Sequence, residues 1–191
     1  FKRKVQKAME SSDNYPLTGI VEIDEFSIGG HEKGKPGRSD GKKKKVLLAV
    51  EIVLNKKQKL TIGRAYSKTI EDYSTKSFEP FFEDKISKKA SIFTDLWSSY
   101  KPLSKQYDIH QEKSNHGESM KLLHTHIMNL KSWVRGIHGH ISSKHAQCYM
   151  DEFHFKFNRR LNLENCFDKT ILRMTQKSWY SYKMATDDLS N

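Results

Sequence analysis

The sequence predicts a mixed α/β fold, with a five-stranded sheet and helices packed on its faces. Three strand-like stretches, at 19–28, 46–54 and 60–67, follow one another without an intervening helix, which favours an antiparallel meander. Two shorter strand-like stretches, at 90–95 and 107–112, then alternate with helical segments. Strands that alternate with helices usually join a sheet in parallel, so we expect a mixed sheet.

Helical periods fill the segments around these strands. The first ten residues and the stretch TIEDYSTKSFEPFFEDKI have helical spacing, and Pro80 in the latter is placed to restart a helix rather than to continue one. A further helix is expected over LWSSYKPLSKQ, between the fourth and fifth strands. Two more are expected over 124–137 and 142–160, where apolar residues recur at helical intervals.

The charge balance favours a polyanionic partner. The chain has 34 lysines and arginines against 23 acidic residues, which gives a net charge of +11. Neutralising phosphates releases condensed counterions, so nucleic acid is the favoured partner, and a basic protein without such a partner is the alternative. The run Lys42, Lys43, Lys44 and Lys45, beside the first strand, either is solvated or holds a phosphate backbone.

The sequence carries no signal for secretion or membrane insertion. The longest apolar run, VLLAV at 46–50, is far shorter than the roughly 20 residues that span a bilayer, and no signal peptide is visible. The two cysteines do not suggest a disulfide scaffold or a zinc ribbon, which fits a reducing cytoplasm. The chain starts without a methionine, so we expect it to be part of a longer protein.

Carboxylates lie at two strand positions where they can meet. TGIVEIDEFSIGG places Glu22, Asp24 and Glu25 on the first strand, and Asp95 ends the strand ASIFTD. Strand alternation puts Glu22 on the Asp24 face, as a supporting or a solvated carboxylate, and turns Glu25 away. Carboxylates from neighbouring strands repel one another, and a divalent metal such as Mg²⁺ resolves that conflict. With the basic surface, this predicts metal-assisted phosphoryl transfer on nucleic acid.

Several motifs, taken in order, carry a family resemblance. They are VEIDEFSIGG, the loop GRSDGKKKK before a strand, FTDLWSSY, LHTHIMNLKSWVRGIHGH and SSKHAQCYMDEFHFKFNRR. Together they resemble the ISXO-type insertion-sequence transposases, members of the DDE superfamily with a ribonuclease-H-like catalytic core. The resemblance covers roughly residues 18–175. It implies a ribonuclease-H-like sheet with a C-terminal helical extension, and an enzyme that cleaves DNA strands and transfers them.

The resemblance also assigns catalytic and metal-binding residues. Asp24 matches the family's first carboxylate and Asp95 the second, while the third position, normally Glu, is matched by Asn129. Some subgroups resemble this chain in carrying Asn there. An amide oxygen is a neutral ligand, so such a site would hold a second ion more loosely. We expect an active enzyme, with a decayed copy that still binds DNA as the alternative.

The basic residue of the site is less well defined. The superfamily tends to place it seven positions after the third ligand, and here that position is Gly136. Arg135 and Lys131 are turned away from the face of the third ligand, whereas His140 would return to it if the helix continued. We regard Lys131, Arg135 and His140 as candidate DNA-binding residues, together with Lys42–Lys44.

The reaction that the resemblance implies uses two Mg²⁺ ions, for which Mn²⁺ can substitute. Its partners would be double-stranded DNA, as element ends and as target, and further copies of the chain on that DNA. The resemblance divides the chain into a linker helix (1–17) from a missing N-terminal DNA-binding region, a catalytic domain (18–165) and a C-terminal helical tail (166–191). It also implies a bacterial cytoplasmic protein associated with the nucleoid. A ribonuclease-H-like nuclease that cuts without joining is a further alternative.

Paired histidines invite a zinc hypothesis. The pairs are His124-x-His126 and His138-x-His140, in a segment that is predicted to be helical. Positions i and i+2 point to different faces of a helix, so the pairs are not expected to share an ion. His124 is expected instead to orient the helix start or to touch DNA.

Two aromatic groups are interpreted as packing. Tyr149, Phe153 and Phe157 recur every four residues and predict a core-facing stripe on a helix. Trp97 and Tyr100 follow Asp95 closely, and we expect them to pack beneath the site, with direct DNA contact as the alternative.

Overall fold

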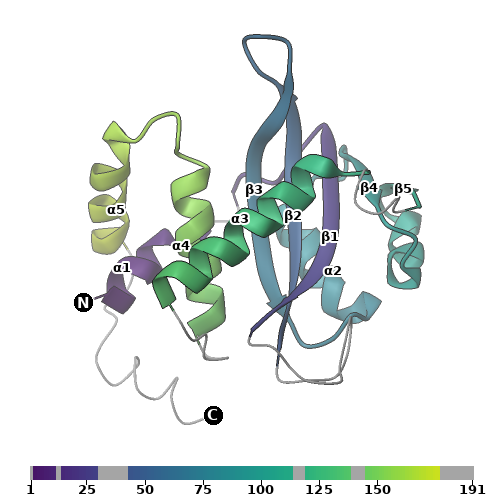
Figure 1. Cartoon of the computed structure of the whole chain (residues 1–191), viewed down its shortest axis with the longest axis horizontal. Coiled ribbons are helices and arrows are strands. Elements are labelled where there is room, and N and C mark those ends of the chain that lie inside the picture. The colour runs from purple at the N-terminus through teal and green to yellow at the C-terminus, as the bar shows by residue number, and fades with distance from the viewer. Residues whose placement is uncertain (1, 12–13, 30–42, 114–118, 139–144, 177–191) are drawn as a thin grey trace.

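The structure is a computed structural model that describes residues 2–11, 14–29, 43–113, 119–138 and 145–176. Its centre is a five-stranded sheet in the order β3-β2-β1-β4-β5 (Figure 1). The strands are β1 (Ile20–Ile28), β2 (Lys44–Leu54), β3 (Leu60–Ile70), β4 (Ser91–Thr94) and β5 (Asp108–Gln111).

The pairing confirms the predicted mixed sheet. β1 pairs with β2 and β2 with β3 in antiparallel ladders, while β4 runs parallel to β1 and β5 parallel to β4. Helical segments connect β3 to β4 and β4 to β5, as parallel pairing requires. The helices are α1 (Lys2–Met9), α2 (Thr75–Lys85), the 3₁₀ helix η1 (Ser98–Lys105), α3 (Lys121–His138), α4 (Ala146–Phe157) and α5 (Glu164–Gln176).

Each face of the sheet has its own apolar core. On one face, Phe26 of β1 and alternate residues of β2 pack against α3 and α4, as Figure 1 shows by the course of α3 across the sheet. On the other face, Val21 and Ile23 of β1 pack against α2 and η1. β2 is buried on both faces over Val46–Ile52, which explains the apolar run VLLAV at 46–50. The strand alternation of β1 therefore determines which helix each of its side chains meets.

Two helical predictions need correction. Pro80 does not restart a helix, because α2 runs through it from an N-cap at Ser74. Proline lacks an N–H and so removes one intrahelical hydrogen bond, but three buried phenylalanines hold α2 on the sheet. The segment LWSSYKPLSKQ forms the 3₁₀ helix η1, in which Pro102 lies, instead of an α-helix.

Side chains of α4 and of the turn after it cover the open edge of β3. Asn158 accepts from the N–H of Ala65 (2.8 Å) and donates to its carbonyl (2.9 Å). Gln147 accepts from the N–H of Thr69 (2.8 Å), and Arg160 donates to the carbonyls of Gly63 and Ile62. An edge strand otherwise presents unpaired backbone groups to other chains, so these contacts close the sheet on that side.

The N-terminal helix packs with the last helices. α1 lies against α4 and α5, where Arg3 donates to the hydroxyl of Tyr149 and Gln6 to Glu152 (Figure 1). The stripe predicted on α4 faces inward: Tyr149 is buried, and Phe153 and Phe157 pack against the core. No helix in the described part of the chain is both long and apolar enough to cross a membrane.

Candidate active site

The register of the two central parallel strands brings the predicted carboxylates together. β1 and β4 pair from Ile20 opposite Ser91 to Glu22 opposite Phe93. Two positions further along, Asp24 and Asp95 come level with one another. β4 ends at Thr94, so on its β4 side this part of β1 has no neighbouring strand, and its acidic side chains can reach the loop that carries Asp95.

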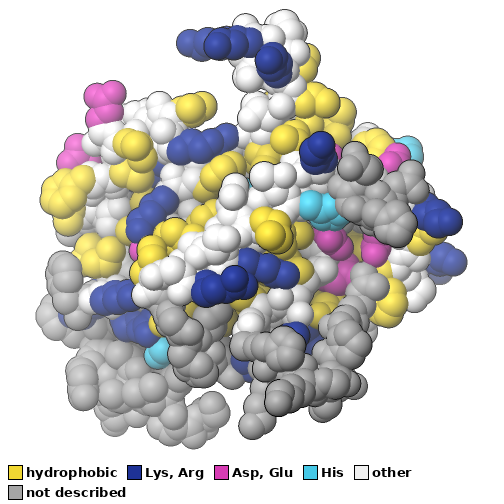
Figure 2. Space-filling model, viewed as in Figure 1, with side chains coloured by type: hydrophobic (Ala, Val, Ile, Leu, Met, Phe, Trp, Pro, Cys, Tyr) yellow, Lys and Arg dark blue, Asp and Glu magenta, His cyan; other side chains and the backbone are white. Residues whose placement is uncertain are grey.

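A cluster of three carboxylates results. One oxygen from each of Asp24, Glu25 and Asp95 lies within 4.8 Å of the other two. The cluster opens into a pocket of about 600 Å³. Figure 2 shows acidic side chains gathered beside α3, next to a histidine, with lysine and arginine side chains nearby. The pocket is lined by Asp24, Glu25, Phe26, Ser27, Tyr73, Asp95, Trp97, Met120, His124 and Lys131.

The Asp95 loop is fixed by its own hydrogen bonds. The Oδ1 atom of Asp95 accepts from the N–H of Trp97 (2.9 Å), which closes a tight turn after β4. The amide of Gln111 on β5 donates to the carbonyls of Asp95 (3.0 Å) and Trp97 (2.9 Å). The indole of Trp97 donates to the carbonyl of Tyr73 (3.0 Å). These bonds hold the second carboxylate in place against the end of the sheet.

Glu25 is held from the opposite face of β1. It is buried, and its Oε2 atom accepts from the hydroxyl of Tyr100 (2.6 Å). Tyr100 is itself fully buried against Phe78 and Phe82 of α2. Burial raises the pKa of the Tyr100 hydroxyl well above its ordinary value, and the adjacent Glu25 raises it further. The phenol therefore stays protonated and donates to the carboxylate.

The start of α3 supplies a histidine to the pocket. The Nε2 atom of His124 lies 3.5 Å from Oδ2 of Asp24. Glu22, on the same face of β1, interacts with the backbone N–H of Leu123 in the first turn of α3. Burial raises the pKa of Glu22, whereas the Leu123 N–H and His124 oppose that shift. Glu22 thus supports the helix start that presents His124, since a carboxylate is stabilised by the free N–H groups there.

Positive charge enters the pocket from Lys131. Its ammonium lies 5.0 Å from the centre of the Phe26 ring and lines the pocket together with Asp24. Burial lowers the pKa of Lys131, Lys43 and Arg135 lower it further, and Asp24 raises it. Lys131, predicted to bind DNA, therefore lies close to the carboxylates. Lys43, also predicted to bind DNA, lies near Lys131, and Arg135 is exposed on the next turn of α3.

The donor set suits a divalent cation. Mg²⁺ prefers carboxylate oxygens in an octahedron with bonds of about 2.1 Å, which places its ligands roughly 3–4 Å apart. One oxygen of each of the three carboxylates lies within 4.8 Å of the other two, so a small side-chain movement would bring them to that spacing. In the described part of the chain, this is the one group of three or more His, Cys, Asp or Glu side chains close enough to share an ion.

Comparison with known families agrees with this geometry. The sequence model of the ISXO2-like transposase domain matches residues 16–158, well over half of the chain. The chain belongs to this transposase family. No curated protein matches the sequence significantly.

Membership confirms the predicted family and the ribonuclease-H-like fold of a DDE transposase. It makes the chain a domain of a nucleic-acid-processing enzyme, and it implies DNA as a partner and a divalent metal at the acidic group. The family match ends at residue 158, before α5 begins.

The transposase structure does not bring Asn129 into the pocket. Asn129 is exposed on α3 and is not among the residues that line the pocket. It follows His124 by five residues, which turns it about 140° around the helix, whereas Lys131 is only about 20° from the His124 direction. The two predicted carboxylates therefore meet, and the predicted third ligand points elsewhere.

Sequence reasoning missed Glu25 and underrated Lys131. Strand alternation correctly put Glu25 on the other face from Asp24, but it could not show that β4 stops short and leaves both side chains room to meet Asp95. Lys131 is turned away from Asn129, as predicted, and it lines the pocket because His124 and not Asn129 marks the helix face that meets the carboxylates. The spacing of seven between His124 and Lys131 is the signal that could have found it.

The other predicted histidine, aromatic and lysine residues lie in different places. His124 and His126 point to different sides of α3, since His124 faces Asp24 and His126 is buried beside His154. Trp97 and Tyr100 pack beneath the pocket as predicted. Lys42, His140 and the side chain of His138 lie outside the described residues, and Lys44 begins β2.

Proposed function

We propose that this transposase domain cleaves DNA strands and joins the freed 3′ ends to target DNA, with Asp24 and Asp95 as metal ligands. The observation that carries the proposal is the carboxylate cluster of Asp24, Asp95 and Glu25, assembled from two strands beside a lysine. Uncompensated, such a cluster is electrostatically unfavourable, and metal-dependent phosphoryl transfer is a function that uses it.

The proposed cofactor is Mg²⁺, as two ions, with Mn²⁺ able to replace it. When bound, such a pair supplies an activated water or 3′-hydroxyl and stabilises the leaving 3′-oxygen. Asp24 and Asp95 would hold the ions, because they come from different strands and their oxygens lie within 4.8 Å of one another. The buried Glu25, oriented by Tyr100, is the nearest third carboxylate.

Asn129 remains the third ligand that the family resemblance predicts, and its exposed position makes Glu25 the stronger proposal. Glu25 is already within reach of both aspartates, whereas Asn129 would need α3 to rotate about its axis. A third carboxylate also keeps the negative charge that two divalent ions require. Metal binding by Glu25→Gln and by Asn129→Ala separates the two assignments.

The chain's own basic residues would place the DNA. Lys131 lies at the mouth of the pocket beside Asp24, where it can bind a phosphate next to the scissile bond. Lys43 and Arg135 extend the positive charge from that point. We further propose that the transposase assembles as a homo-oligomer on DNA, since joining two element ends to one target calls for more than one such site.

One assay separates strand transfer from simple cleavage and from DNA binding alone. Full-length protein is incubated with element-end and target duplexes and Mn²⁺, and wild type is compared with Asp95→Ala. Cleaved and joined products that are lost in the variant support transposition. Cleaved products without joined ones would indicate a nuclease. Equal behaviour of the two proteins would overturn the catalytic proposal and leave a DNA-binding remnant.

A further inference from the structure

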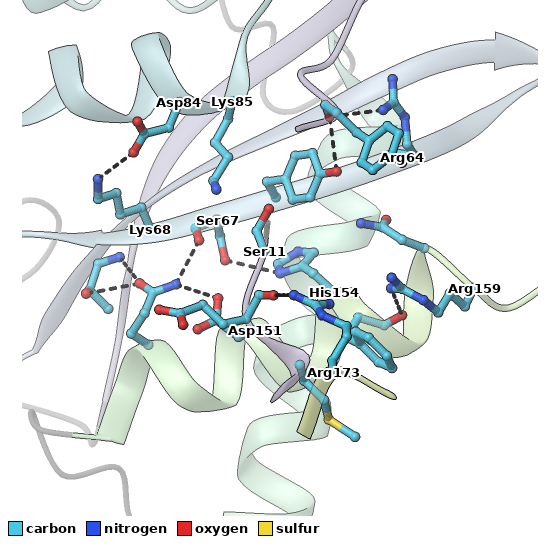
Figure 3. Close-up of a pocket in the computed structure, with 18 of the residues that line it drawn as sticks. Ser11, Arg64, Ser67, Lys68, Asp84, Lys85, Asp151, His154, Arg159 and Arg173 are labelled. Atoms are coloured by element: carbon cyan, nitrogen blue, oxygen red, sulfur yellow. Dashed lines mark hydrogen bonds and ion pairs between the residues drawn. The ribbon is translucent and has the colours of Figure 1, made fainter. Parts of the chain in front are cut away.

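A second cavity of about 690 Å³ lies apart from the carboxylate pocket, and Figure 3 shows residues that line it. It is an open groove between β3, α1, α4 and α5, and it shares no lining residue with the carboxylate pocket. Six basic and three acidic side chains line it. They are Arg64, Lys68, Lys85, Arg159, Lys169 and Arg173, and Glu10, Asp84 and Asp151.

The acidic side chains of the groove already lie beside cations. Asp84 pairs with Lys68 (3.3 Å), and Glu10 pairs with Lys7 outside the groove (3.0 Å). Asp151 lies near Lys85, and each of the two favours the charged form of the other. Arg64 on the opposite wall is bound to Glu51 (2.7 Å), a residue outside the groove. Three basic groups of the groove form no ion pair among the described residues, although Glu10 and Asp151 lie near enough to Arg173 to favour its charged form.

Those groups are Arg159, Lys169 and Arg173, and none of them forms an ion pair within the described part of the chain. Arg159 and Arg173 donate only to backbone carbonyls there, of Phe155 and Glu10. Their guanidinium carbons lie 3.7 Å and 5.7 Å from the centre of the same Phe155 ring. Two like charges are thus held close together on one wall.

The two guanidiniums repel one another, and a bound anion would offset that repulsion. Burial lowers the pKa of Arg159, and the neighbouring Arg173 lowers it further. The Nε atom of Arg159 is buried and has no hydrogen-bond partner among the described residues. Lys169 lies one helical turn before Arg173 on α5, so its ammonium extends the same basic edge.

We propose that this groove binds the phosphate backbone of a DNA duplex, with Arg159, Lys169 and Arg173 as its phosphate-contacting residues. Paired guanidiniums suit phosphate oxygens, and an open groove suits a continuous backbone. The groove would hold a DNA segment away from the carboxylate pocket. The inference rests on the proposed DNA-processing function, and it adds a second DNA contact outside the cleavage site.

The test measures DNA binding without catalysis. Full-length protein is titrated into a fluorescent 30-base-pair duplex by anisotropy, in EDTA, over a range of NaCl concentrations. The variants are Arg159→Gln, Lys169→Gln and the double variant. The matched control is Lys105→Gln, an exposed lysine of η1 at the other edge of the sheet. Arg173 is left intact because it also ties α5 to α1.

The double variant should weaken binding on the order of tenfold and reduce the slope of log affinity against log salt by about 2, one for each lost phosphate contact. Arg159→Lys should keep most of the affinity, and Lys105→Gln should match wild type. Unchanged affinity and slope in the folded double variant would overturn the proposal. If that variant unfolds, Lys169→Gln alone decides, because the Lys169 side chain is exposed and its loss leaves the packing intact.

Two further measurements distinguish DNA binding from capture of a free anion and from catalysis. Inorganic phosphate that binds to wild type and is lost in the variants, with DNA affinity unchanged, would indicate a free-anion site and overturn the DNA assignment. Asp95→Ala should bind DNA in EDTA as wild type does. If wild type does not cleave DNA, the proposed catalysis is refuted. If the double variant still loses DNA affinity in that case, the groove assignment stands.

Discussion

The carboxylate pocket depends on single side chains that come from both faces of β1. Asp24 meets His124 on the α3 face, and Glu25 meets Tyr100 on the α2 face. Asp95 joins them from the loop after β4. Each carboxylate is thus oriented by a different element: Asp24 by α3, Glu25 by η1 and Asp95 by the turn after β4.

Glu25 should matter more for metal binding than Asn129. Glu25→Gln removes a charge from the cluster and should weaken Mn²⁺ binding by about 10–100-fold, whereas Asn129→Ala should change it less than about twofold. Tyr100→Phe, which removes the hydrogen bond to Glu25, should give a smaller loss. Isothermal titration of the folded proteins with Mn²⁺ measures all three. Normal binding in Glu25→Gln with a large loss in Asn129→Ala would restore Asn129 as the third ligand.

At the residue scale, the sequence predicted Asp24 and Asp95 because motif and strand pattern agree at those positions. It could not predict Glu25, since that depends on where β4 ends, nor the direction of Asn129, since that depends on the rotation of α3 about its axis. Both depend on tertiary packing, which a local pattern does not encode.

The helix α4 both fills the core and covers the edge of the sheet. Its stripe fills the core, and residues along it and just after it satisfy the open edge of β3. In the motif KFNRR, Asn158 and Arg160 bind that edge while Arg159 turns to the groove. The sequence identified this motif by family resemblance alone, because its partner strand lies about ninety residues earlier.

Loss of the edge contact should destabilise the domain. Asn158→Ala leaves the N–H and carbonyl of Ala65 without their partner and should lower the free energy of unfolding by about 1–3 kcal/mol. Asn158→Asp keeps the acceptor and should lose less. Urea unfolding gives the values, with Lys156→Ala as control, since its exposed pair with Glu152 contributes less than about 1 kcal/mol. Equal stability of Asn158→Ala and Lys156→Ala would contradict the role of the edge contact.

α3 and α4 are joined by a buried histidine pair. The Nε2 atoms of His126 and His154 lie 3.3 Å apart, and Nδ1 of His154 lies 2.9 Å from the carbonyl of Met150. If His154 donates a hydrogen bond through Nδ1–H to the Met150 carbonyl, its Nε2 accepts a hydrogen bond from Nε2–H of His126, so both rings are neutral. Burial lowers the pKa of His126 to about 4 and that of His154 to about 3.

The histidine pair should therefore make the fold less stable as the pH falls below 6.5. Both folded-state pKa values lie below the ordinary 6.5, so stability is full above pH 6.5 and falls as the unfolded chain takes up protons between pH 6.5 and about 4. The steepest loss is about 1.4 kcal/mol per pH unit for each histidine. Urea unfolding between pH 7 and 5 measures it, and His126→Phe should flatten the dependence.

Asp151 should have the opposite effect on the pH dependence of stability. Burial raises its pKa to about 6, so it stabilises the fold as pH falls from 6 towards its ordinary 3.8. Asp151→Asn should thus steepen the acid-dependent loss. A His126→Phe variant with the pH dependence of wild type would show that the histidine pair does not govern it.

At the scale of the whole molecule, sheet order positions the chemistry. The sheet runs from the covered edge at β3 to β5, and the carboxylates lie at its centre, where parallel and antiparallel pairing meet. The mixed sheet could be predicted because the strand patterns and their intervening helices are strong. The packing of α1 against α4 and α5 could not, because it joins the two ends of the described chain and leaves no local signal.

The two cavities are proposed to have different roles in handling DNA. The carboxylate pocket at the centre of the sheet is proposed to act on the scissile phosphodiester, and the basic groove at the β3 edge to hold DNA away from it. Basic side chains line both cavities, Lys131 beside Asp24 in the first and Arg159 with its neighbours in the second.

Asp95 is proposed to hold a metal ion that takes part in DNA cleavage. The most direct test is the cleavage rate of an element-end duplex by full-length Asp95→Cys, in Mg²⁺ and in Mn²⁺. A thiolate is a poor ligand for Mg²⁺ and a better one for softer ions. We predict a rate about 10³-fold below wild type in Mg²⁺ and a partial recovery in Mn²⁺. A variant that cleaves as fast as wild type in Mg²⁺, or a wild type that cleaves equally well in EDTA, would contradict the claim.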